Sequence, residues 1–188
     1  AVSFVTAVML TGLLRTAALQ IGFLDKPVAR SSHSTPTPLG GGFAVVFLVF
    51  IASVYAFYAG QLEKGFFLSL FGAYAVAAVG LIDDLKNVHA IWRIPLHFGA
   101  ALWSLFWLGE IPALDFGLFT ILNQSVLIPL ALLALVWLTN LFNFMDGIDG
   151  LAGSELCFVT GFSLAAGISG MDSGRSELLT VACASTAG

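Results

Sequence analysis

The sequence predicts an all-α integral membrane protein: six full transmembrane helices in a bundle, followed by a truncated seventh. Of its 188 residues 59% are hydrophobic and only 10% are charged, and the mean hydropathy is +0.98. Soluble chains carry about 25% charged residues, so a soluble domain of this composition could not cover its own surface. The apolar residues come in long runs rather than in alternation, which favours helices over a β-barrel.

Several functional classes are excluded by the same numbers. A cytosolic globular protein and a disordered chain do not fit so apolar a composition. The formal net charge is -4 and the pI is near 5.1, so nucleic acid is not an expected partner.

Each predicted span is an uninterrupted apolar segment that reaches, or nearly reaches, the length of about 17–25 residues needed to cross a bilayer. We expect spans at Ala1–Leu24, Gly41–Tyr58, Gly65–Ile82, Val88–Leu108, Ile121–Phe142 and Leu151–Ile168. The closing run, Ser176–Gly188, is too short to span, and the chain opens at Ala1 inside an apolar stretch. Residues 1–188 are therefore expected to form a single, incomplete transmembrane domain.

Three connectors carry most of the polar chemistry: Asp25–Gly40, Asp83–Asn87 and Asn143–Gly150. They follow the first, third and fifth predicted spans, and each span reverses the side of the membrane, so all three are expected on one side. Four basic residues lie in or near them, against two near the opposite connectors: Lys26, Arg30, Lys86 and Arg93 against Lys64 and Arg175. The positive-inside rule then predicts that the three connectors face the cytoplasm.

The first connector is rich in hydrogen-bond donors and positive charge. Its prolines, Pro36 and Pro38, argue against a helix. Its side chains suit a phosphate or a pyrophosphate, and the candidate ligand-binding residues are Lys26, Arg30, Ser32 and His33. An ordinary basic cytoplasmic loop explains the same residues equally well.

The second connector begins with two adjacent carboxylates, Asp83 and Asp84, at the end of a span. Such carboxylates are costly unless something pairs with them. If the helix continues, Asp83 and Asn87 become i, i+4 neighbours, and the cluster could bind Mg²⁺ directly or through water. A solvated helix end with a local Lys86 pair is the alternative.

The third connector belongs to a block in which polar residues recur at every third position, Asn140-Leu-Phe-Asn143-Phe-Met-Asp146-Gly-Ile-Asp149-Gly. Glycine follows each Asp, which predicts an unwound backbone whose side chains converge on a ligand. Amide and carboxylate oxygens suit Mg²⁺, and they also accept hydrogen bonds from a ribose or a uracil. An EF-hand is excluded by the spacing, and a plain glycine-rich turn is the alternative.

Taken in order, the three blocks resemble the polyprenyl-phosphate N-acetylhexosamine-1-phosphate transferases, also called glycosyltransferase family 4, and in particular the branch that begins O-antigen and related surface glycans. The resemblance covers essentially the whole chain. It implies a multi-pass enzyme of the bacterial inner membrane whose active site faces the cytoplasm. Such an enzyme moves a sugar 1-phosphate from a UDP-N-acetylhexosamine to undecaprenyl phosphate and releases UMP. It also implies Mg²⁺ as cofactor, with Mn²⁺ as a substitute, membrane lipid as surroundings and a homodimer as a candidate assembly.

The resemblance further implies a role for each candidate residue. Asp83 and Asp84 would be catalytic, acting as base, nucleophile or electrostatic organiser beside the two phosphate groups. Asn143 and Asp149 would hold the metal. The substrate-binding residues would be Lys26, Arg30, Ser32, His33, Asn87, Asn140, Asp146 and Asp149.

Two family features do not occur in residues 1–188: a Gly-Asp-x-Gly-Ser block and a His-containing substrate loop. The resemblance therefore implies about half an active site, and an isolated fragment without transferase activity. A secondary transporter or ion pathway remains the alternative, although it would place carboxylates near mid-span. Cys157 and Cys183 lie inside apolar runs and are expected to be small buried hydrophobes.

Overall fold

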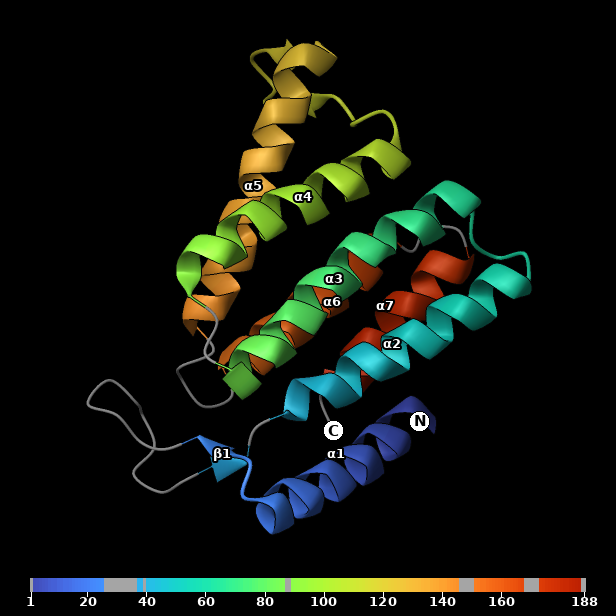
Figure 1. The fold of residues 1–188 in the computed structure, drawn as a ribbon. Helices are drawn as coiled ribbons and strands as arrows, with labels where there is room; N and C mark the ends of the chain where they lie inside the picture. Colours follow the sequence, from blue (N-terminus) through green and yellow to red (C-terminus); the bar gives the residue numbers. More distant parts are fainter. Residues whose placement is uncertain are drawn as a thin grey trace. The chain divides into compact units, whose positions relative to one another are not determined.

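The structure is a computed structural model that describes residues 2–25, 37–38, 40–86, 89–145, 151–167 and 173–186. In this part of the chain seven α-helices are joined by loops and two pairs of very short strands (Figure 1). The elements are α1 (Val2–Ile21), β1 (Leu24–Asp25), β2 (Thr37–Pro38), α2 (Gly41–Tyr58), α3 (Lys64–Lys86), α4 (Ala90–Leu108), β3 (Leu114–Asp115), β4 (Thr120–Ile121), α5 (Gln124–Met145), α6 (Leu151–Gly167) and α7 (Ser173–Thr186).

Four of the described helices, α1, α2, α3 and α5, are long and apolar enough to cross a membrane. The chain is thus a helical, multi-pass membrane protein. Each predicted span corresponds to a helix whose ends differ by at most four residues from the predicted ones. Two of these helices lie outside the set of four: α4 contains Arg93, Pro95 and His97, and α6 has only 17 residues. The count of six full spans therefore stays a prediction.

Two predicted boundaries are wrong in a way that matters for the site. Helix α3 continues through Asp83 and Asp84 to Lys86, and α5 continues through Asn143 to Met145, so these three side chains stand on helices rather than in connectors. Neither stretch contains glycine or proline, and Leu and Lys favour helix, so nothing in the local sequence ends the helix earlier.

The strands are short additions to the predicted all-α fold. β1 pairs antiparallel with β2, Leu24 opposite Pro38, which brings the two ends of the first connector together. Gly40 follows with a φ of 91°, a left-handed conformation that glycine adopts without strain, and α2 begins at the next residue. In the connector between α4 and α5, β3 pairs with β4, Leu114 opposite Ile121.

The helices pack in two compact units. The first comprises Ala1–Glu63 and Asn143–Gly188, and the second Lys64–Phe142. In the first unit α7 packs against α1, α2 and α6, and α1 also contacts α2. Gly174, in the first turn of α7, lies so close to the chain after α2 that a Cβ there would be 2.4 Å from the carbonyl oxygen of Gln61. Glycine at this position therefore permits the contact.

In the second unit α3 and α4 form an antiparallel pair. The indole of Trp103 donates a hydrogen bond to the carbonyl of Leu68 (2.9 Å), and the hydroxyl of Ser104 donates one to the carbonyl of Ser69 (2.8 Å). A Cβ on Gly72 would lie 2.5 Å from the carbonyl oxygen of Ala100, so the two backbones are nearly in contact. Small residues at helix contacts are typical of packing within membranes.

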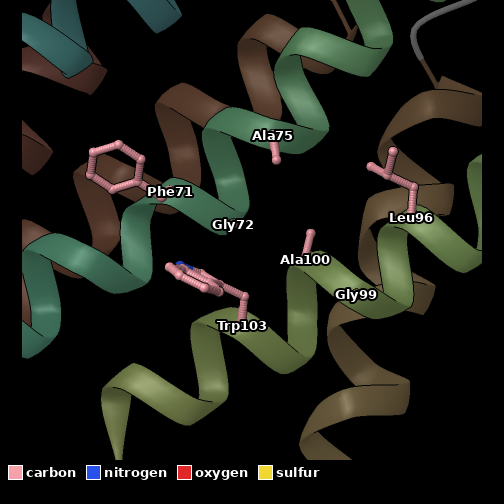
Figure 2. A pocket seen from close by; sticks show the side chains of 7 residues that line it. All are labelled: Phe71, Gly72, Ala75, Leu96, Gly99, Ala100 and Trp103. Atoms are coloured by element: carbon pink, nitrogen blue, oxygen red, sulfur yellow. The ribbon is translucent and has the colours of Figure 1, made fainter.

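An apolar groove lies beside this contact (Figure 2). Its volume is about 290 Å³, and the ring of Trp103 lies across it next to Gly72. The lining residues are Phe71, Gly72, Ala75, Leu96, Gly99, Ala100 and Trp103.

Large apolar side chains point outward along the described helices. Leu13, Phe106, Trp137 and Phe162 are each about two thirds exposed or more, whereas Ala7, Ala44 and Ser53 are fully buried. Most buried residues are small, with Leu127 a large exception, and many large apolar residues face outward. This arrangement is the reverse of what water favours and suits a lipid environment.

Candidate active site

The end of α3 and the start of α4 are joined by an ion pair between Asp83 and Arg93. Nη1 of Arg93 donates to Oδ2 of Asp83. The two side chains are only 21% and 22% exposed, so the pair is largely withdrawn from water. Exposed ion pairs contribute about 0–1 kcal/mol, but removing one partner of a buried pair leaves an uncompensated charge and costs more.

Asp84 lies in a different environment from Asp83. Successive residues of an α-helix point about 100° apart, so a side chain next to one that faces α4 turns away from it. Asp84 is accordingly exposed, whereas Asp83 is part-buried against Arg93. The adjacent carboxylates are therefore suited to different tasks.

The partner of Asp83 was not identified from the sequence. The sequence offers Lys86, three residues further along the same helix, as a local partner, but the structure supplies Arg93 from the next helix. Only one signal in the sequence pointed to it: a basic residue at the start of the span that follows the acidic pair.

The first turn of α4 places Arg93. His89 is the N-cap of this helix, and its Nδ1 accepts a hydrogen bond from the amide of Ile91 at 3.5 Å. An N-cap of this kind satisfies an amide that the first turn leaves unpaired. One turn beyond Arg93, His97 is only 6% exposed, and its Nδ1 has no hydrogen-bond partner in the described part of the chain.

The last turns of α5 carry the described half of the third polar block. Asn140 donates through Nδ2 to the carbonyl oxygen of Val136 at 2.7 Å, which fixes the orientation of its amide. Asn143 lies three residues further on, and therefore on the same side of the helix, with its side chain exposed. Both amides thus stand near the end of α5 that leads into the Asp146-Gly-Ile-Asp149 sequence.

The remaining predicted site residues lie outside the described residues. They are Lys26, Arg30, Ser32, His33, Asn87, Asp146 and Asp149. Among the residues that the structure describes, no three His, Cys, Asp or Glu side chains gather as metal ligands. The described contacts therefore join Asp83 to Arg93. They do not test the metal site at Asn143 and Asp149, which stays a prediction.

Comparison with known proteins agrees with these blocks. The sequence model of glycosyl transferase family 4 matches residues 66–188. A probable undecaprenyl-phosphate N-acetylglucosaminyl 1-phosphate transferase of Bacillus subtilis is 28% identical, covering 80% of this chain and 42% of the relative. A decaprenyl-phosphate N-acetylglucosaminephosphotransferase of Mycobacterium tuberculosis is 34% identical, covering 76% and 38%. A phospho-N-acetylmuramoyl-pentapeptide-transferase of Borreliella afzelii is 28% identical, covering 79% and 46%.

The chain spans less than half the length of each of these relatives. The matched range, residues 66–188, nevertheless contains the positions of Asp83, Arg93, Asn140 and Asn143 and the Asp146-Gly-Ile-Asp149 sequence. The family predicted from the three polar blocks is confirmed. The chain belongs to glycosyl transferase family 4.

Proposed function

We propose that the full-length protein transfers an N-acetylhexosamine 1-phosphate from a UDP-sugar to undecaprenyl phosphate and releases UMP. The observation that carries this proposal is the family match over residues 66–188, together with relatives whose names describe transfer to polyprenyl phosphates. The lipid-linked product would begin a surface glycan such as O antigen or a cell-wall polymer. The transporter alternative is less favoured, because Asp83 and Asp84 stand at the end of α3 rather than at mid-span.

The proposed reaction requires the protein to position two phosphate groups and to neutralise their charge. A phosphate oxygen of the lipid attacks the sugar-bearing β-phosphorus of the donor, and the bond between that phosphorus and the oxygen of UMP breaks. Because the lipid phosphate is already an anion, little deprotonation is needed. Catalysis then rests on positioning the two phosphate groups and on neutralising charge at the transferred phosphoryl group.

The two carboxylates would divide this work. Arg93 forms a part-buried ion pair with Asp83, so we assign Asp83 to organising the site electrostatically. Asp84 is exposed at the same helix end, so we assign it the position nearer the reacting phosphates, as a base toward the lipid phosphate. If Asp84 acted instead as a nucleophile, its carboxylate would first attack the β-phosphorus and release UMP. The lipid phosphate would then attack the same phosphorus and free the carboxylate. The cationic residues of the first connector, Lys26 and Arg30, would bind the diphosphate.

The oxygen-donor set of α5 and the block that follows fits Mg²⁺. Asn143 presents an exposed amide near the end of α5, and carboxylates and amide oxygens are the ligands that Mg²⁺ prefers. In this proposal Asn143 and Asp149 hold the ion, which Mn²⁺ could replace. When bound, it would neutralise charge on the diphosphate. The substrates would be contacted by Ser32 and His33 of the first connector and by Asn87, Asn140 and Asp146.

The proposal places all three polar connectors at the cytoplasmic face of the bacterial inner membrane. This topology requires α4 and α6 to cross the bilayer in addition to α1, α2, α3 and α5. Arg93 lies in the first turn of α4, within reach of the interface, where a long basic side chain can keep its charge close to water.

The test is charge removal in the full-length protein. Asp84→Asn and Asp149→Asn should each lower the rate of UMP release about 100-fold or more. An amide in place of Asp84 cannot act as base or nucleophile, and a general base contributes about 10²–10⁴-fold. An amide in place of Asp149 removes a negative charge from the Mg²⁺ ligands. Membrane insertion should be unchanged. Glu110→Gln, in the connector between α4 and β3, is the control and should keep the normal rate. Near-normal rates for both Asp variants would contradict the site.

A further inference from the structure

Two cysteines that the sequence presents as separate apolar residues lie side by side on α6 and α7. The Sγ atoms of Cys157 and Cys183 are 3.6 Å apart, and the Cys183 thiol is 3.7 Å from the carbonyl oxygen of Cys157. Both are free thiols, and both are only part-buried rather than enclosed as expected. Each sulfur therefore lies within reach of the other, and the described chain does not fully enclose either residue.

The register of the two helices holds the thiols opposite each other. Cys157 lies ten residues before the end of α6, and Cys183 lies ten residues after the start of α7. A Cβ on Gly161, one turn beyond Cys157, would lie 3.9 Å from the Cys183 sulfur, so Cys183 packs over the position where α6 has no side chain. The pairing thus follows from how the two helices pack.

We propose that Cys157 and Cys183 form a redox-sensitive dithiol that closes reversibly to a disulfide between α6 and α7. The sulfurs would have to approach from 3.6 Å to a bond length of about 2.05 Å. Rotation of the two thiols and a small helix movement cover that difference of about 1.5 Å. The proposal does not depend on the transferase activity.

The oxidant in this proposal is a low-molecular-weight disulfide such as oxidised glutathione. One cysteine thiolate attacks it, forms a mixed disulfide and releases one glutathione thiol. The second cysteine thiolate then attacks the protein sulfur of that mixed disulfide and displaces the second glutathione. The protein loses two electrons and two protons, and one glutathione disulfide becomes two thiols.

The disulfide would tether the α6–α7 pair close to the third polar block. Cys157 lies within two turns of Leu151, where α6 begins directly after Gly150. Disulfides in reducing compartments are usually transient and redox-sensing rather than structural, so we expect an open dithiol under reducing conditions. Closure would restrict movement of α6 against α7 at that end of the helix pair.

The experiment uses the full-length protein in membranes treated with oxidised glutathione. Free thiols are then blocked with N-ethylmaleimide, and the denatured protein is digested with trypsin and examined with and without reductant. Arg175 is the only Lys or Arg between the two cysteines, so cleavage there leaves two pieces that only the disulfide can join. We expect joined pieces without reductant and separate pieces after reduction.

Matched variants keep the test specific. Cys157→Ser and Cys183→Ser should each abolish the joined species. Cys183→Ser combined with Leu179→Cys moves the thiol one turn along α7, about 6 Å at a rise of 1.5 Å per residue, and should also fail to close. Pieces that stay separate after oxidised glutathione and after membrane-permeant copper phenanthroline would overturn the proposal. A link found only between two copies of the chain would overturn it as well.

Discussion

Asp83 and Asp84 are neighbours in sequence but differ in how far they are exposed. The guanidinium of Arg93 holds Asp83 in a largely buried pair, whereas Asp84 is exposed. Arginine presents a rigid fork of donors to a carboxylate, and lysine presents a single, strongly hydrated point charge. The pair should therefore depend on the shape of Arg93 as well as on its charge.

The first prediction concerns this pair in the full-length protein. Arg93→Ala should lower the transfer rate at least 10-fold and destabilise the fold by about 3 kcal/mol, because it leaves Asp83 buried without a counter-charge. Arg93→Lys should retain part of the transfer rate and part of the stability. Enzyme assays in membranes and thermal unfolding in detergent measure the two effects.

A double variant separates charge from packing. Combining Arg93→Ala with Asp83→Asn removes the uncompensated charge, so its unfolding temperature should recover toward that of the parent protein while the rate stays low. If the double variant is no more stable than Arg93→Ala, the pair does not act as an ion pair.

For single residues, the sequence predicted that the carboxylates at the end of this span need a paired group, but not which residue supplies it. Two carboxylates at a span's end indicated that something pairs with them, and this was right for Asp83. The partner proved to be Arg93, because an antiparallel contact between α3 and α4 brings together residues that local spacing cannot relate. The three-residue spacing of Asn140 and Asn143 was read as part of a block with an unwound backbone, but both residues lie on α5, which continues to Met145.

The contact between α3 and α4 positions Asp83 against Arg93, and Gly72 lets the two helices approach each other closely. A Cβ on Gly72 would lie 2.2 Å from Oγ of Ser104 and 2.5 Å from the carbonyl oxygen of Ala100. A backbone carbonyl cannot rotate away as a flexible side chain can, so the helices themselves would have to separate. Gly80, in the same helix, has nothing within 4 Å of the same position.

The second prediction follows from this difference. Gly72→Ala should destabilise the protein by about 1–3 kcal/mol through overpacking. Gly80→Ala is the matched control and should be neutral or stabilise by up to about 1 kcal/mol, because alanine favours helix. Unfolding midpoints of the two variants in the same detergent make the comparison. Equal midpoints would mean that α3 and α4 do not pack as closely as described.

Helices were easier to predict than their ends. Long apolar runs indicated all seven described helices, because hydrophobicity alone identifies a segment that can enter a bilayer. Apolar composition does not indicate where a helix ends, so α3 and α5 continue past their predicted limits into polar residues. Helix α5 begins at Gln124 rather than at the predicted Ile121 for a different reason. Ile121 pairs in β4, and the Asn123 side chain accepts a hydrogen bond from the amide of Ser125 at 2.9 Å.

For the whole molecule, topology depends on α4. If α4 crosses the membrane, the connector after α5 returns to the same side as those after α1 and α3. If it does not cross, Asn143–Gly150 lies on the opposite side, away from Asp83 and Asp84. The active site proposed here requires the first arrangement.

The third prediction tests this by thiol labelling in a Cys157→Ser, Cys183→Ser background. Single cysteines at Ser34, Asn87 and Gly150 should resist a membrane-impermeant maleimide applied from the periplasmic side and react once the inner face is opened. Labelling of Gly150→Cys alone from outside would show that α4 does not span. Labelling of all three from the periplasmic side would show that the three connectors face the periplasm.

The central claim is that a sugar 1-phosphate, rather than a sugar alone, moves to the lipid. The most direct measurement supplies the full-length protein with undecaprenyl phosphate, Mg²⁺ and UDP-N-acetylglucosamine carrying ³²P only at the β-phosphate. The account predicts that the label enters the lipid fraction in step with the release of unlabelled UMP. Label that stays in water-soluble UDP while the sugar reaches the lipid would contradict the account.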